Sequence, residues 1–177
     1  MRITPAKFAT MEDYYNFGKK QYPTLNYRPD PLQFLVDDLP WVVLALAGML
    51  FGGLQVPWLH DLILGLSGFL ALHLLYKYLL MRQAVYIITD EILAWHHGII
   101  ERSVEYIELY RIIDYRERHT FMQQLFGLKT VIIYSGDRTM PQLKIPGITT
   151  DCNLVETIRE RVEYNRTRKP IYEISNR

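Results

Sequence analysis

Two adjacent apolar runs constrain this chain more than any other feature of its sequence. They cover residues 41–59 and 62–81, and only His60 and Asp61 separate them. Each run has about 20 residues, enough to cross a hydrocarbon core of about 30 Å as a helix. A chain of 177 residues has no interior large enough to bury two helices that are apolar on every face. We therefore expect a transmembrane helical hairpin whose short link makes the two helices antiparallel.

The positions of Lys and Arg predict how this hairpin is oriented. The link between the two runs contains neither residue type. The basic residues lie beyond the outer ends of the hairpin or in its last turn: Arg2, Lys7, Lys19, Lys20, Arg28, Lys77 and Arg82. By the positive-inside rule, both termini are expected to be cytoplasmic. The N-terminal sequence lacks the apolar region of a cleaved secretory signal, so the first helix is expected to direct membrane insertion.

Glycines recur at helical spacing in both runs. Gly48 and Gly52 form a small-xxx-small pair in the first, and Gly65 and Gly68 thin one side of the second. Small residues let helices approach each other closely. These glycines therefore indicate either packing within the hairpin or a docking face for another membrane protein. Lys77, near the cytoplasmic end of the second helix, is expected to extend its ammonium group to the interface.

The first 40 residues form a segment rich in aromatic residues and proline. Its candidate partner-binding residues are Tyr14, Tyr15, Phe17 and Tyr22. The prolines forbid a long continuous helix, but residues 32–39 place apolar side chains on one face and predict a short interfacial helix. The aromatic cluster is too apolar for a typical disordered tail. It is expected to pack either on the chain's own domain or on a partner protein.

After the hairpin the sequence changes to short segments rich in β-branched and aromatic residues, which predict a meandering antiparallel sheet or barrel. The segments are 84–89, 91–98, 99–109, 112–120, 130–136 and 142–147. Thr89 and Asp90 form an expected tight turn, and residues 135–137 form another. An amphipathic helix should follow Asp151, with Thr150 or Asp151 as its N-cap, because apolar residues recur there at helical spacing.

The ordered set of these segments resembles the bacterial pleckstrin-homology-like (bacterial PH) domain family. The residues that carry the likeness are Tyr86 to Asp90, Gly98 to Ile100, Ile107, Leu109, Arg111 to Asp114, Gln124 to Gly127 and Thr130 to Ile132. The likeness covers residues 82–165 and excludes the N-terminal 40. It implies one or two transmembrane helices, then a bent antiparallel β-barrel with a C-terminal capping helix. It also implies a short helical turn between Phe121 and Gly127.

The expected architecture is thus an α+β membrane protein of the bacterial cytoplasmic (inner) membrane. An N-terminal arm (1–40) precedes the transmembrane hairpin (41–81), the PH-like domain (82–166) and a C-terminal tail (167–177).

The sequence contains no recognisable catalytic set, such as G-x-S-x-G, H-E-x-x-H or a P-loop. His96 and His97 are adjacent, so on a strand they point to opposite faces and cannot share a metal. Cys152 is the single cysteine and lies beside Asp151, which disfavours a thiolate. The net charge of +1 gives no pull toward nucleic acid. We expect no enzyme activity, no metal and no cofactor.

Three functions remain open, and two of them have the most support. The third, a transport or proton-handling role, rests only on the shared helix face of His73 and Lys77. The first is an adaptor or accessory subunit that stabilises a larger membrane complex. It is predicted by the glycine-lined faces of the hairpin and by a domain without a recognisable catalytic set. The resemblance extends this to photosynthetic or respiratory assemblies, with other integral membrane proteins and membrane lipids as partners. The alternative is peripheral recognition of anionic lipid by the domain, which would help to organise the envelope. A phosphoinositide site at the first turn is disfavoured, because Thr89, Asp90 and Glu91 make that turn acidic.

Overall fold

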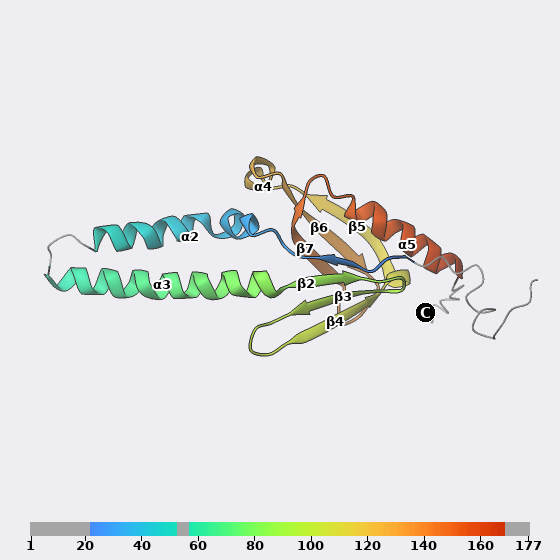
Figure 1. Cartoon of the computed structure of the whole chain (residues 1–177), viewed down its shortest axis with the longest axis horizontal. Coiled ribbons are helices and arrows are strands. Elements are labelled where there is room, and N and C mark those ends of the chain that lie inside the picture. The colour runs from blue at the N-terminus through green and yellow to red at the C-terminus, as the bar shows by residue number, and fades with distance from the viewer. Residues whose placement is uncertain (1–21, 53–56, 169–177) are drawn as a thin grey trace, which may run out of the picture.

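The computed structural model, which describes residues 22–52 and 57–168, consists of two long helices beside a domain of two β-sheets (Figure 1). Helix α2 covers Leu32–Phe51 and helix α3 covers Pro57–Gln83. The two helices pack side by side and project from one end of the domain (Figure 1). Both are long and apolar enough to cross a membrane, and 11% of each apolar span is buried inside the protein. This combination suggests membrane association.

Helix α2 begins nine residues before the predicted start at Trp41 and ends at Phe51 instead of residue 59. Residues 32–39, expected as a separate interfacial helix, form its first turns, and Pro40 lies inside it. The expected helix boundary at Pro40 is therefore wrong, whereas Pro23, Pro29 and Pro31 precede the helix. A single proline removes one backbone hydrogen bond, which an apolar helix tolerates when its other turns are intact.

Helix α3 also begins earlier than predicted. His60 and Asp61 lie in its first turns instead of linking the two helices, and Pro57 is its first residue. Proline suits the first helical position, because the backbone N–H that it lacks has no partner within the helix there. The connection between the helices falls at residues 53–56, outside the described residues.

The domain contains two separate antiparallel sheets. The first has the order β1 (Leu25–Tyr27), β2 (Val85–Ile88), β3 (Ile92–His97) and β4 (Ser103–Glu108). The second has the order β5 (Ile112–Arg118), β6 (Leu128–Ser135) and β7 (Gln142–Thr149). The six predicted strands are confirmed, and β1 is an addition from the N-terminal arm.

The described strands do not close into a barrel, which corrects the expected β-barrel. The 3₁₀ turn η1 (Leu109–Arg111) lies between β4 and β5 and carries the chain from one sheet to the other. Helix α5 (Leu154–Arg168) packs beside η1 and covers this side of the domain. The strands that flank η1 are therefore the edges of two sheets and not neighbours in one.

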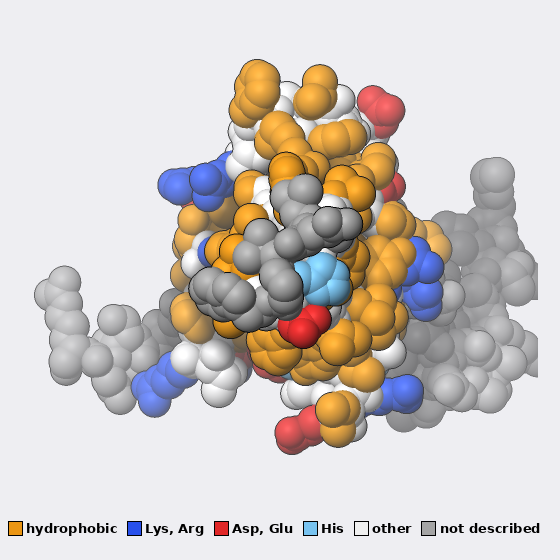
Figure 2. All heavy atoms as spheres, turned by 90° about the vertical axis from the view of Figure 1, so that its left-hand side faces the viewer, with side chains coloured by type: hydrophobic (Ala, Val, Ile, Leu, Met, Phe, Trp, Pro, Cys, Tyr) orange, Lys and Arg blue, Asp and Glu red, His pale blue; other side chains and the backbone are white. Residues whose placement is uncertain are grey.

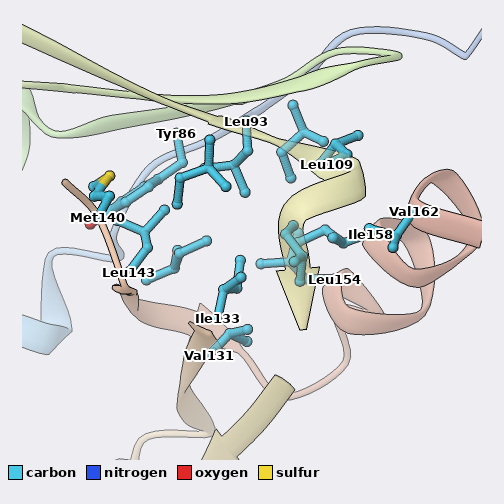
Figure 3. Close-up of a cluster of buried hydrophobic side chains, with 14 of the residues drawn as sticks. Tyr86, Leu93, Leu109, Val131, Ile133, Met140, Leu143, Leu154, Ile158 and Val162 are labelled. Atoms are coloured by element: carbon cyan, nitrogen blue, oxygen red, sulfur yellow. The ribbon is translucent and has the colours of Figure 1, made fainter. Parts of the chain in front are cut away.

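The core lies between the sheets and under α5 (Figure 3). Figure 3 shows inward-facing side chains from both sheets meeting Leu154, Ile158 and Val162 of α5. The predicted amphipathic helix is thus confirmed, although it begins after Asn153, later than either expected N-cap. The expected turn after residue 120 is helix α4 (Phe121–Leu125), where Thr120 and Gln123 form a capping box.

Candidate functional site

Gly48 and Gly52 face the partner helix within the hairpin. A Cβ atom at Gly48 would lie 2.0 Å from Oγ of Ser67, and one at Gly52 would lie 2.6 Å from Cδ2 of Leu64. Neither position has room for a side chain while α2 and α3 keep their present distance. The structure therefore places this pair in the packing of the hairpin itself.

Gly65 and Gly68 lie on the outside of α3. A Cβ atom at either position would meet nothing within 4 Å among the described residues. Gly68 shares a helical face with Ala71 and Leu75. Those two residues line an apolar groove of about 260 Å³ between the helices, which Phe34, Val42, Ala45, Leu46, Met49, Leu74 and Tyr78 also line. Gly48 and Gly52 thus serve the packing between α2 and α3, whereas Gly65 and Gly68 lie on an open face of α3 beside the groove.

An ion pair joins the two helices near the domain. Nζ of Lys77 lies 2.5 Å from Oδ1 of Asp38, whose side chain is 7% exposed. Lys77 therefore pairs with α2 and does not simply extend to the interface as predicted. The sequence prediction missed this role of Asp38, because it placed the residue before the first helix. The available signal was an acidic residue just before the first apolar run and a lysine near the end of the second, because an antiparallel hairpin brings these two positions to the same end.

Polar contacts fix the start of α2 on the domain. Nε2 of Gln123 donates to Oε1 of Gln33 at 2.9 Å and to Oγ1 of Thr130 at 2.7 Å. The backbone N–H of Asp30 donates to the carbonyl of Gly147 at 2.9 Å. Gly147 has φ +67°, and a Cβ atom there would lie 2.9 Å from Asp30 N. A left-handed glycine is what lets the two backbones approach so closely. Isolated glutamines carry no sequence pattern, so this junction was not predicted.

Tyr22 lies on the chain's own domain. Its backbone N–H donates to Oδ1 of Asp90 at 2.7 Å, and its ring packs edge-on against Tyr164 at 5.7 Å. The Arg161 guanidinium lies 5.2 Å from the centre of the Tyr22 ring. Strand β1 follows and pairs with β2, so residues 22–27 pack in cis. The other candidate residues of the arm, Tyr14, Tyr15 and Phe17, lie outside the described residues.

Several buried polar side chains of the domain, such as Arg161 and Asn165, donate hydrogen bonds to backbone carbonyls. Among the described residues, no group of three or more His, Cys, Asp or Glu side chains is placed to hold a metal ion. The ring of His97 packs at a tilt against Trp95, with 4.0 Å between the ring centres, and Nε2 of His97 lies 3.2 Å from Oε1 of Glu105. Burial raises the pKa of Tyr86 well above its usual value and raises that of Tyr115 to about 12. Both hydroxyls therefore stay neutral at physiological pH.

Two long apolar helices, two antiparallel sheets and a covering C-terminal helix define the class of fold. The chain belongs to the Bacterial PH domain family, whose model matches residues 35–166. The match begins inside α2, so it includes both helices as well as the domain. Comparison with curated proteins and with solved structures gave no match.

Proposed function

We propose that this chain is a non-catalytic adaptor or accessory subunit of the bacterial cytoplasmic membrane. In this proposal α2 and α3 span the membrane, both termini are cytoplasmic, and the hairpin binds and stabilises a larger membrane complex, such as a photosynthetic or respiratory assembly. The observation that carries the proposal is the open face of α3 at Gly65 and Gly68.

Close approach of helices is the main source of affinity inside a bilayer. Lipid tails are as apolar as leucine, so burying apolar surface gives no net gain there, and packing at small residues decides which helices associate. In this hairpin Gly48 and Gly52 already serve internal packing. Gly65 and Gly68, together with the groove along Ala71 and Leu75, leave a concave surface that suits a helix of another membrane protein.

The rigid junction supports an adaptor role. Gln33, Gln123 and Gly147 join the first turn of α2 to the domain through direct hydrogen bonds and close backbone contact. The Asp38–Lys77 pair ties α3 to the same turn region of α2. A partner bound to the hairpin would therefore meet the cytoplasmic domain in a fixed position.

The test is extraction of the full chain from its native membrane in mild detergent, followed by sizing and identification of co-migrating proteins. We expect a stoichiometric set of membrane proteins that is lost in the Gly65→Leu/Gly68→Leu variant. The matched control is Leu66→Phe, which adds bulk at an exposed position on another face of α3 and should keep the set. A wild-type chain that always runs alone would contradict the proposal.

A further inference from the structure

The end of the domain from which the helices project carries an apolar rim. It consists of Ile100 in the β3–β4 loop and Phe121 and Leu125 in α4, which are 92%, 79% and 71% exposed. Figure 1 shows that this loop and α4 lie at the hairpin end of the domain, on either side of the helices. Figure 2 looks along the hairpin and shows hydrophobic side chains at opposite edges of the same face. Exposed apolar side chains placed around membrane-spanning helices would rest in the bilayer interface.

A basic cleft lies next to this rim. It has a volume of about 400 Å³, and its lining includes Arg28, Arg82, Arg102 and His96. The fold brings these residues together from four elements. Arg82 is in the last turn of α3, and strand pairing sets Tyr27 opposite Tyr86, Val85 opposite His96 and His97 opposite Ser103. Arg28 follows Tyr27 in the chain, and Arg102 precedes Ser103. Both arginines therefore lie near Arg82, where α3 is followed by β2.

The arginines of the basic cleft have no acidic partner among the described residues. The ion pairs in that part of the chain involve other basic groups, and no acidic residue lines the cleft. Glu105 contacts His97, and Glu101 lies in the loop outside the cleft lining. Three guanidinium groups around one cavity repel one another, and a bound anion would remove that cost.

We infer that the basic cleft binds the phosphate of an anionic phospholipid in the cytoplasmic leaflet. Arginine forms paired, charge-assisted hydrogen bonds with phosphate oxygens, and three arginines from separate elements can surround one such group. The adjacent apolar rim and the end of the second candidate membrane span at Gln83, next to Arg82, place the cleft at headgroup depth. This site is at the opposite end of β2 and β3 from the acidic Thr89–Glu91 turn. It is independent of the docking face at Gly65 and Gly68.

The test measures retained lipid by native mass spectrometry of the full chain in detergent, titrated with phosphatidylglycerol or with phosphatidylcholine. The wild-type chain should retain phosphatidylglycerol preferentially. Each arginine near a lipid phosphate contributes about fivefold in affinity, so Arg28→Gln/Arg82→Gln/Arg102→Gln should weaken binding on the order of a hundredfold. The single variant Arg102→Gln, in the exposed loop, should bind phosphatidylglycerol about fivefold more weakly. This variant tests the inference if the triple variant does not fold.

The matched control is Arg138→Gln/Lys144→Gln/Arg159→Gln, which removes the same charge from exposed positions outside the cleft and should keep the preference. Equal retention of both lipids by the wild-type chain would overturn the inference, and so would unchanged binding by the triple cleft variant. Millimolar inorganic phosphate should leave the lipid bound. Displacement by phosphate would instead identify a soluble phosphate compound as the ligand.

Discussion

Arg161 is a buried side chain that connects α5 to two other parts of the domain. It is 1% exposed, and its guanidinium donates to the carbonyls of Ile88 and Thr89 at 2.9 Å and of Pro23 at 2.7 Å. It therefore joins α5 to the end of β2 and to the N-terminal arm. Replacing Arg161 with methionine keeps much of the side-chain volume but leaves three carbonyl groups without their donor.

The expected cost follows from these contacts. A hydrogen bond that involves a charged group contributes about 1.5–3 kcal/mol, so three give a gross loss of about 4.5–9 kcal/mol. Methionine no longer has a buried charge to desolvate, which offsets several kcal/mol of that loss. We expect Arg161→Met to lower the free energy of unfolding by about 3 kcal/mol. With a urea dependence of about 2 kcal/mol per M, the midpoint should fall by about 1.5 M.

The assay is urea denaturation of the full chain in detergent, followed by near-ultraviolet circular dichroism, which reports aromatic packing in the domain. The control is Arg159→Met on the same helix. The Arg159 side chain is 70% exposed and pairs with Glu163, so its loss should cost no more than about 0.5 kcal/mol. A loss of less than about 1 kcal/mol for Arg161→Met would refute the assigned role of the guanidinium.

Three further predictions concern the junction and the core. Lys77→Met should destabilise the hairpin by about 3 kcal/mol, because it leaves the Asp38 carboxylate buried without its partner. Thermal unfolding in detergent measures this, and the double variant with Asp38→Leu should recover most of the loss. Gly147→Ala should cost about 2 kcal/mol in urea denaturation, because φ is +67° and the new Cβ would lie 2.9 Å from Asp30 N. Burial raises the pKa of Tyr86 and raises that of Tyr115 to about 12, so the folded state favours the neutral phenols. The contribution of these two tyrosines to stability should therefore be constant below about pH 10, the unfolded pKa, and should fall as pH rises toward 12. A midpoint that does not change across this range would contradict the burial of these hydroxyls.

The regular elements of the domain were predictable because each carries a local signal. The strands appear as short runs of β-branched and aromatic residues, such as β6, which is buried along most of its length. The spacing of Leu154, Ile158 and Val162 follows from the apolar face of α5. Strand β1 was not predictable in this way. It has three residues between prolines, and pairing with β2 is what makes it a strand.

Contacts between residues that are far apart in the sequence could not be predicted from local patterns. Hydropathy identified the hairpin but placed the start of α2 at Trp41, because Pro40 and the two aspartates before it resemble a helix boundary. The structure instead places Asp38 inside α2, where it forms an ion pair with Lys77 of α3. The same limit applies to the basic cleft, where Arg28, Arg82 and Arg102 are far apart in sequence and meet only through strand pairing.

The most direct measurement is the labelling of single cysteines with a membrane-impermeant maleimide in intact spheroplasts and in inside-out vesicles. In a Cys152→Ala background, the positions are His60→Cys near the tip of the hairpin and Asp137→Cys in the loop between β6 and β7. A hairpin that spans the membrane predicts labelling at position 60 in spheroplasts alone and at position 137 in inside-out vesicles alone. Labelling of both positions from the same side would contradict a membrane-spanning hairpin that holds the PH domain against the cytoplasmic leaflet.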